Sequence, residues 1–241
     1  KASIEQRAPQ DTDMLLEMSE ADTISSRPVR RIVQGILKGS NRLHDVVDAM
    51  LDVSLIEQEA FSLHPIPVSL GHIMNQVVGS LEKAVEERQQ QLTMIGFDSL
   101  PDVIADETHL HQALRNVIVN GIKFTPDQGR IDVRARTLNG DGQIELAVSD
   151  TGIGIDPADH DLIFEKFYRV GHLNLHSTGQ TKFKGAGPGL GLPIARGIIE
   201  AHGGQIWVES RGYDEETCPG STFYIVLPID GPDRALNEVV I

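Results

Sequence analysis

Asp150 is the residue whose type and position point most directly to chemistry. Residues 143–149 alternate as a strand does. The apolar members of that strand share one face and are Ile144, Leu146 and Val148. One further step places Asp150 on the same apolar face. Burying a carboxylate there is unfavourable unless a hydrogen-bond donor, such as an exocyclic amine, binds it. Gly152 and Gly154 follow and let main chain approach a flat ligand. The stretch predicts a carboxylate that receives the amino group of adenine, and an ordinary Asp-Thr-Gly turn is the alternative.

A second polar group lies on a helix predicted over 107–124. Asn116, Asn120 and Lys123 stand at i, i+4 and i+7, so they share one stripe that is separate from the apolar face. Asparagine is a poor helix former, and two of them one turn apart indicate a polar site. Amide oxygens suit a hard cation such as Mg²⁺ that takes further ligands from phosphate and water. A solvated helix face would give the same pattern.

A glycine cluster over 185–192 reads GAGPGLGL and leads straight into a predicted helix. Such a helix start exposes main-chain N–H groups to an anion. It is neither a P-loop nor a dinucleotide-binding fingerprint, because the Gly-Lys-Ser/Thr ending and the preceding strand are both missing. The long connection over 156–184 precedes it and is predicted to be functional or mobile. Lys182 and Lys184 in it are candidates for phosphate contact or for plain solvation.

The elements that must position these residues follow from periodicity and turn signals. Helices are predicted over 29–59, 70–91, 107–124 and 189–202, and strands over 92–97, 103–105, 130–138, 143–150, 205–210 and 221–228. Residues 61–69 contain two prolines and are predicted to be a linker. The first helix is long and amphipathic, which favours a partner helix in a hairpin or dimeric bundle over packing along its own domain.

The composition narrows the class of protein. The 241 residues carry 21 Lys and Arg against 35 Asp and Glu, a net charge of −14, which argues against a general nucleic-acid binder. Cys218 is the single cysteine, so there is no internal disulfide framework and a cytoplasmic setting is expected. No apolar run is long enough to cross a bilayer, so no membrane contact is expected from this fragment. The chain begins with Lys1, which suggests a fragment and leaves room for a membrane anchor elsewhere in the full-length protein.

Four motifs together resemble those of the ATP-binding catalytic domain of sensor histidine kinases, which shares its fold with DNA gyrase B, Hsp90 and MutL. The stretches that resemble the N, G1, F and G2 boxes are residues 116–126, 150–154, 164–169 and 185–192. The resemblance implies an α+β fold, a two-layer α/β sandwich (the Bergerat fold) with a mixed, mostly antiparallel sheet and helices on one face. It implies a partial dimerisation and phosphotransfer hairpin with its linker over 1–64, the ATP-binding catalytic domain over 65–230, and a tail over 231–241.

The resemblance also implies ATP and Mg²⁺ as cofactors and a role for each motif. Asp150 would take the adenine amino group, with Gly152 and Gly154 shaping that wall. Asn116 and Asn120 would bind magnesium, and Lys123 would contact phosphate. Further nucleotide contacts would come from Phe167, Gly187, Gly189, Leu190 and Gly191. Residues 156–188 would form the mobile ATP lid.

The family reaction moves the γ-phosphoryl group of ATP to a histidine and then to an aspartate of a response-regulator receiver domain. The implied partners are therefore that receiver domain and a second copy of the chain, paired through the helical hairpin. Hydrolytic relatives carry a glutamate where Asn116 stands. Loss of that carboxylate removes the general base that would activate water, which suits transfer to protein rather than hydrolysis.

The sequence departs from the family pattern at the acceptor histidine. No H box is present, and His44 lies on the second hairpin helix, where the pattern does not place the acceptor. The simplest hypothesis is that the fragment begins after that histidine and does not autophosphorylate unaided. Alternatives are a histidine-less regulatory ATP-binding scaffold, a gyrase- or Hsp90-type ATPase, and a serine/threonine kinase of the same fold.

Overall fold

The structure, a computed structural model, describes residues 29–37, 39–40, 43, 47, 63–138, 142–168, 183 and 189–232. The chain divides into two compact units, Lys1–Asp48 and Ala49–Ile241. In the first unit residues 29–37 are helical. Its exposed apolar side chains are Val29, Ile32, Val33, Ile36, Leu43 and Val47. They recur at the helical steps expected of an amphipathic stripe. Most of the remainder of the predicted helix, His44 included, lies outside the described residues.

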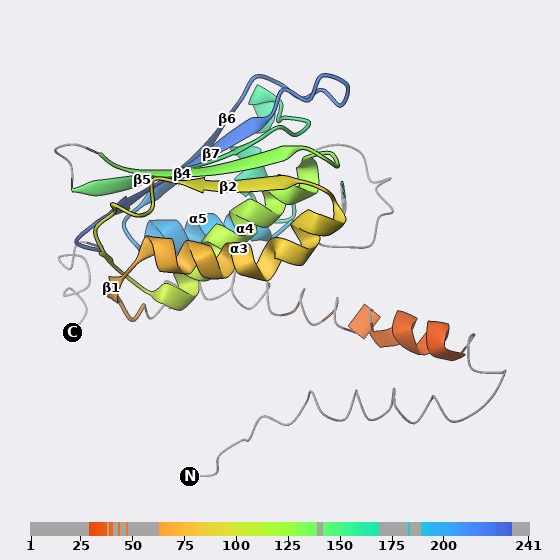
Figure 1. Cartoon of the computed structure of the whole chain (residues 1–241), viewed down its shortest axis with the longest axis horizontal. Coiled ribbons are helices and arrows are strands. Elements are labelled where there is room, and N and C mark those ends of the chain that lie inside the picture. Colours follow the sequence, from red (N-terminus) through yellow and green to blue (C-terminus); the bar gives the residue numbers. More distant parts are fainter. Residues whose placement is uncertain are drawn as a thin grey trace, which may run out of the picture. The chain divides into compact units, whose positions relative to one another are not determined.

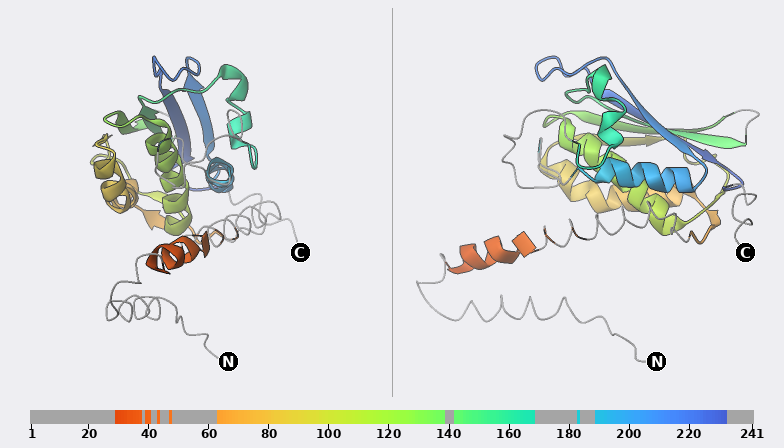
Figure 2. Two further views of the ribbon diagram at one scale, coloured as in Figure 1. Left: turned by 90° about the vertical axis from the view of Figure 1, so that its right-hand side faces the viewer. Right: turned by 180° about the vertical axis from the view of Figure 1, so that it is seen from behind.

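The second unit is built on a five-stranded sheet with the order β2-β4-β5-β7-β6 (Figure 1). Its strands are β2 (Gln91–Ile95), β4 (Arg130–Leu138), β5 (Gln143–Asp150), β7 (Ser221–Pro228) and β6 (Gln205–Ser210). The β2–β4 pair is parallel and the other three pairs are antiparallel. The helices are α3 (Leu70–Glu87), α4 (Glu107–Phe124) and α5 (Gly191–Ala201). All three cover the same face of the sheet (Figures 1 and 2), which confirms the predicted two-layer sandwich.

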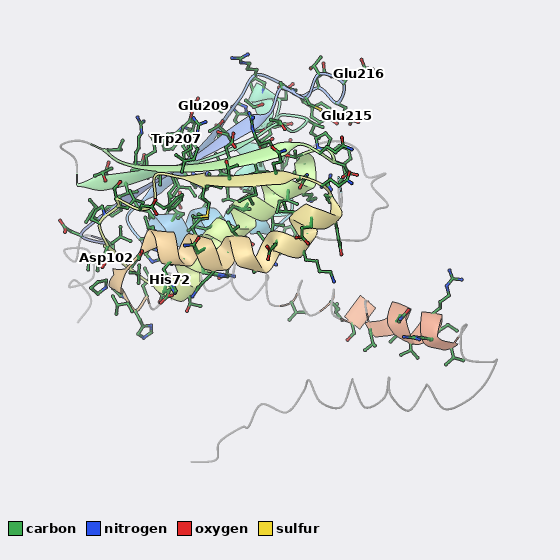
Figure 3. All side chains as sticks on the ribbon, viewed as in Figure 1. His72, Asp102, Trp207, Glu209, Glu215 and Glu216 are labelled. Carbon is green, nitrogen blue, oxygen red and sulfur yellow. The ribbon has the colours of Figure 1, made fainter. Side chains whose placement is uncertain are left out.

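The core lies between the sheet and these helices. Along β5 and β7 every second residue is buried, as the period of two in the sequence requires. The other face of the sheet is open, and Figure 3 shows Trp207 and Glu209 on it. There Trp207 stacks on Tyr224 with ring centroids 5.2 Å apart.

A short strand pair corrects the predicted linker. β1 (Ile66–Val68) pairs antiparallel with β3 (Val103–Ala105), so the linker prediction over 61–69 is wrong for these three residues. Pro67 stands opposite Ile104 in this ladder. Proline is tolerated in a two-stranded ladder because each strand is an edge, where a missing N–H need not break a bond.

Residues with positive φ move two of the predicted helix boundaries. α3 ends at Glu87 rather than near residue 91, because Gln89 adopts a φ of 52°. α5 begins at Gly191 rather than 189, because Gly189 has a φ of 74°. A left-handed residue cannot continue a right-handed helix, and hydrophobic periodicity carries no sign of it. By contrast, α4 has the predicted bounds, and its cap Asp106 accepts a bond from the His109 N–H at 3.1 Å.

No helix in the described part of the chain has the length and apolar character that crossing a bilayer requires.

Candidate functional site

Asp150 ends the buried row of β5, as the alternation predicts. It lies between Ile131 of β4 and Ser221 of β7 in the ladder. Its side chain points toward α4, because a Cβ built on Gly121 would lie 3.9 Å from the Asp150 Cβ. The absence of a side chain at Gly121 therefore leaves α4 close to the carboxylate.

Burial changes the proton affinity of this carboxylate. Desolvation raises the pKa of Asp150 from 3.8 to about 6, and main-chain hydrogen bonds from Gly152 and Ser221 oppose part of that rise. The Gly152 N–H donates to Asp150 Oδ1 at 2.8 Å. A half-buried carboxylate of this kind gains from any further donor that the site brings to it.

Gly152 permits a close approach that no other residue could make. A Cβ there would lie 2.6 Å from both Phe124 O and Asp150 Oδ1, well inside van der Waals contact. The next N–H, from Ile153, donates to Phe124 O at 3.2 Å. The loop after β5 is therefore bonded directly to the last turn of α4.

The loop between β6 and β7 holds the loop after β5 from the other side. The Asp214 and Gly220 N–H groups donate to Ile153 O and Gly152 O, both at 2.8 Å. Tyr213 forms a bridge with Gly154. We did not predict any role for this loop, and its sequence carries no local signal, because its partners lie some sixty residues earlier in the chain.

Ser210 is a further residue that sequence reasoning missed. Its Oγ accepts from the Ile155 N–H at 3.0 Å and donates to Gly220 O at 2.7 Å. One hydroxyl thus joins the loop after β5 to the loop before β7. Its place at the end of a strand does not reveal that function.

The polar stripe on α4 lies beside its buried face. Asn116, Asn120 and Lys123 are partly exposed, while Leu114, Val117 and Ile118 are fully buried. The Lys123 ammonium lies 4.8 Å from the Phe124 ring centroid. The predicted separation of polar and apolar stripes on this helix is confirmed.

The start of α5 meets this stripe. A Cβ built on Gly191 would lie 3.7 Å from Asn116 Cγ. Leu190, just before the helix, is buried in the core, so only its main chain is available to a ligand. The structure therefore brings the helix start and the first asparagine together. Gly187, Lys182 and Lys184 lie outside the described residues.

Two segments meet where the long connection begins and ends. The Phe167 N–H donates to Gly189 O at 3.1 Å, and Phe167 has a φ of 64° with an exposed ring. A Cβ on Gly189 would lie 3.1 Å from the Phe167 Cα, so a larger residue there would push the segments apart. Between residues 168 and 189 the structure describes only Phe183, whose ring centroid lies 5.6 Å from Arg88 Cζ.

The side-chain oxygens on α4 suit a magnesium ion that takes its other ligands from phosphate and water. Among the described residues no group of three or more His, Cys, Asp or Glu side chains could hold a metal ion by itself. The oxygens available on α4 are neutral amides from Asn116 and Asn120. Such oxygens are ligands for a hard cation, which keeps water and phosphate as its other ligands.

Comparisons with known proteins identify the family of this chain. Residues 105–231 match the family described as "Histidine kinase-, DNA gyrase B-, and HSP90-like ATPase". Cyanobacterial phytochrome A of Nostoc sp. is 32% identical over 221 residues, which cover 91% of this chain and 26% of that protein. Adaptive-response sensory kinase SasA of Synechocystis sp. is 32% identical over 186 residues, 76% of this chain and 44% of that protein.

A solved structure extends the likeness to three dimensions. Full-length ShkA, crystallised in complex with AMPPNP, superposes with a TM-score of 0.71 at 25% identity, over 87% of this chain and 40% of that one. The chain spans about a quarter of the first of these two curated relatives and under half of the second. The chain belongs to the histidine kinase-, DNA gyrase B- and HSP90-like ATPase family, and its second unit contains the ATP-binding domain of a sensor histidine kinase.

Proposed function

We propose that this chain is the ATP-binding catalytic part of a two-component sensor histidine kinase. It binds ATP with Mg²⁺ and transfers the γ-phosphoryl group to a histidine that lies outside this sequence. The bond from phosphorus to the β–γ bridging oxygen breaks, a nitrogen–phosphorus bond forms, and ADP leaves. The observation that supports this most is that α4 lies close to both Asp150 and the start of α5. A Cβ built on Gly121 would lie 3.9 Å from the Asp150 Cβ, and one built on Gly191 would lie 3.7 Å from Asn116 Cγ.

Each group has a role in this proposal. Asp150 receives the adenine amino group, and Lys123 with the N–H groups before α5 meets the phosphate charge. Asn116 and Asn120 hold the magnesium ion, which when bound neutralises phosphate charge and orients the γ-phosphoryl group. The amide of Asn116 cannot take a proton from water, which favours transfer over hydrolysis.

A transfer assay tests the proposal. The chain is incubated with γ-labelled ATP, Mg²⁺ and a separate hairpin that carries an H box histidine. Label on the hairpin, lost on acid treatment as expected for phosphohistidine, supports a histidine kinase. Steady release of phosphate with no label on the hairpin would instead identify a hydrolase.

The partners are a second copy of the chain and a response-regulator receiver domain. The exposed apolar stripe of the first unit supports the pairing of two copies, because an uncovered stripe of Val29, Ile36 and Leu43 gains by burial against its own equivalent. Sedimentation of the chain and of Ile36→Asp tests this pairing, and equal masses for the two would contradict it. The reaction is assigned to the cytoplasm, where ATP is supplied.

A further inference from the structure

Two buried polar side chains lie just after α3 and belong to none of the sequence motifs. Arg88 is 8% exposed and Gln90 is 6% exposed. Buried polar groups are costly unless their hydrogen bonds are satisfied. Both of these reach the C-terminal end of α4, the helix that carries the polar stripe.

Arg88 and Gln90 bind the same main-chain oxygens. The Arg88 guanidinium donates from Nη1 to Ile122 O and from Nη2 to Thr125 O, the latter at 2.7 Å. Gln90 Nε2 donates to the same two oxygens at 3.1 and 2.9 Å. The last carbonyls of a helix have no intrahelical partner, and a cation near them is favourable. We call these two side chains the α4 clamp.

The Phe124 carbonyl, between these two in the sequence, has a different partner. Phe124 O accepts from the Ile153 N–H of the loop after β5. The last turn of α4 is therefore bonded both to the α4 clamp and to the loop next to Asp150. Lys123 belongs to this turn, and Asn120 precedes it by less than one turn.

We propose that Arg88 and Gln90 are positioning residues for the phosphate side of the nucleotide site. The inference rests on the proposed function. The α4 clamp fixes where the last turn of α4 stands relative to Asp150, and so where Lys123 and Asn120 meet the phosphates. Asp150 depends less on the clamp, because β4 and β7 flank it and the β6–β7 loop secures the residues that follow it.

The test compares two ligands that differ only in the phosphate side. Adenosine and an ATP analogue with Mg²⁺ are titrated into the wild-type chain, Arg88→Met and Gln90→Leu. We expect affinity for the magnesium nucleotide to fall about tenfold to a hundredfold, which corresponds to the loss of one charge-assisted hydrogen bond to the phosphates. Affinity for adenosine should change by less than about threefold. A merely structural defect would lower both affinities in the same proportion, and that result would overturn the inference.

Two further variants complete the design. Arg88→Lys keeps the charge but lacks the planar fork, so it should bind the magnesium nucleotide at an intermediate affinity. Wild-type affinity in Arg88→Lys would overturn the inference. If Arg88→Met does not fold, the single variants Arg88→Lys and Gln90→Leu provide the test. The matched control is Arg136→Met, which loses an exposed ion pair to Glu145 at 2.7 Å and should bind both ligands normally. A wild-type chain that binds neither ligand would refute the proposed function itself.

Discussion

Asp150→Asn should make the ligand-free protein more stable while it weakens nucleotide binding. The substitution keeps the shape of the side chain and removes its charge. In the folded protein burial raises the pKa of Asp150 to about 6, from an ordinary value of 3.8. The folded state therefore binds a proton more tightly than the unfolded chain does, so ionisation of Asp150 opposes folding.

The size of the stability effect follows from the difference in pKa. Each unit of difference between the two pKa values corresponds to about 1.4 kcal/mol, so ionised Asp150 lowers the free energy of unfolding by at most about 3 kcal/mol. The side chain is only half-buried, and solvent reduces that cost. We therefore expect the free energy of unfolding of Asp150→Asn to exceed that of the wild type by about 1–3 kcal/mol near pH 7. The cost is absent below about pH 4, grows as pH rises, and is complete above about pH 6.

Binding should change in the opposite direction. The carboxylate that receives the adenine amine must be ionised, and with a pKa of about 6 only about a tenth of it is ionised at pH 5. Adenosine affinity of the wild-type chain should therefore fall about tenfold between about pH 8 and about pH 5. Loss of a charged hydrogen bond in Asp150→Asn should cost about 1.5–3 kcal/mol of binding free energy.

Calorimetric titration with adenosine and urea unfolding of both proteins provide the measurements. Adenosine carries no phosphate, so its own ionisation does not enter the pH profile. The Asp150→Asn profile is the control and should be flat. Unchanged adenosine affinity in this variant, or a variant that is less stable than the wild type at pH 7, would refute the reasoning.

Three further experiments test other parts of the structure. Asn120→Ala should weaken ATP binding in the presence of Mg²⁺ more than in its absence, and equal losses in the two titrations would count against a metal role. Gly152→Ala should lower the free energy of unfolding in chemical denaturation, because its Cβ would lie 2.6 Å from Phe124 O. Gly121→Ala should not lower it, because a Cβ there would lie no closer than 3.8 Å to any atom outside its own helix and alanine suits a helix interior better than glycine does. Burial lowers the pKa of His202, so the folded state resists its protonation. The contribution of His202 to stability should then fall as pH drops through about 6.5, and His202→Leu should remove it. The same dependence of stability on pH in the wild type and in His202→Leu would contradict this reasoning.

Local sequence patterns were enough to predict most of the elements and the end of the buried row at which Asp150 stands. The bounds of β4, β5, β6, β7 and α4 were predicted correctly. So was the position of Asp150 at the end of a buried row. These features depend on periods of two and 3.6 residues and on caps such as Asp106, all of which act over a few neighbouring positions. The nucleotide contacts of the motif residues stay predictions.

Tertiary structure decided what holds those residues together. The α4 clamp joins Arg88 to oxygens 34 and 37 residues away, and Ser210 reaches the loop after β5 across 55 residues. The left-handed conformations of Gln89 and Gly189 set two helix boundaries that periodicity misplaced. No local pattern encodes such contacts, because their partners become neighbours only when the sheet and the helices pack together.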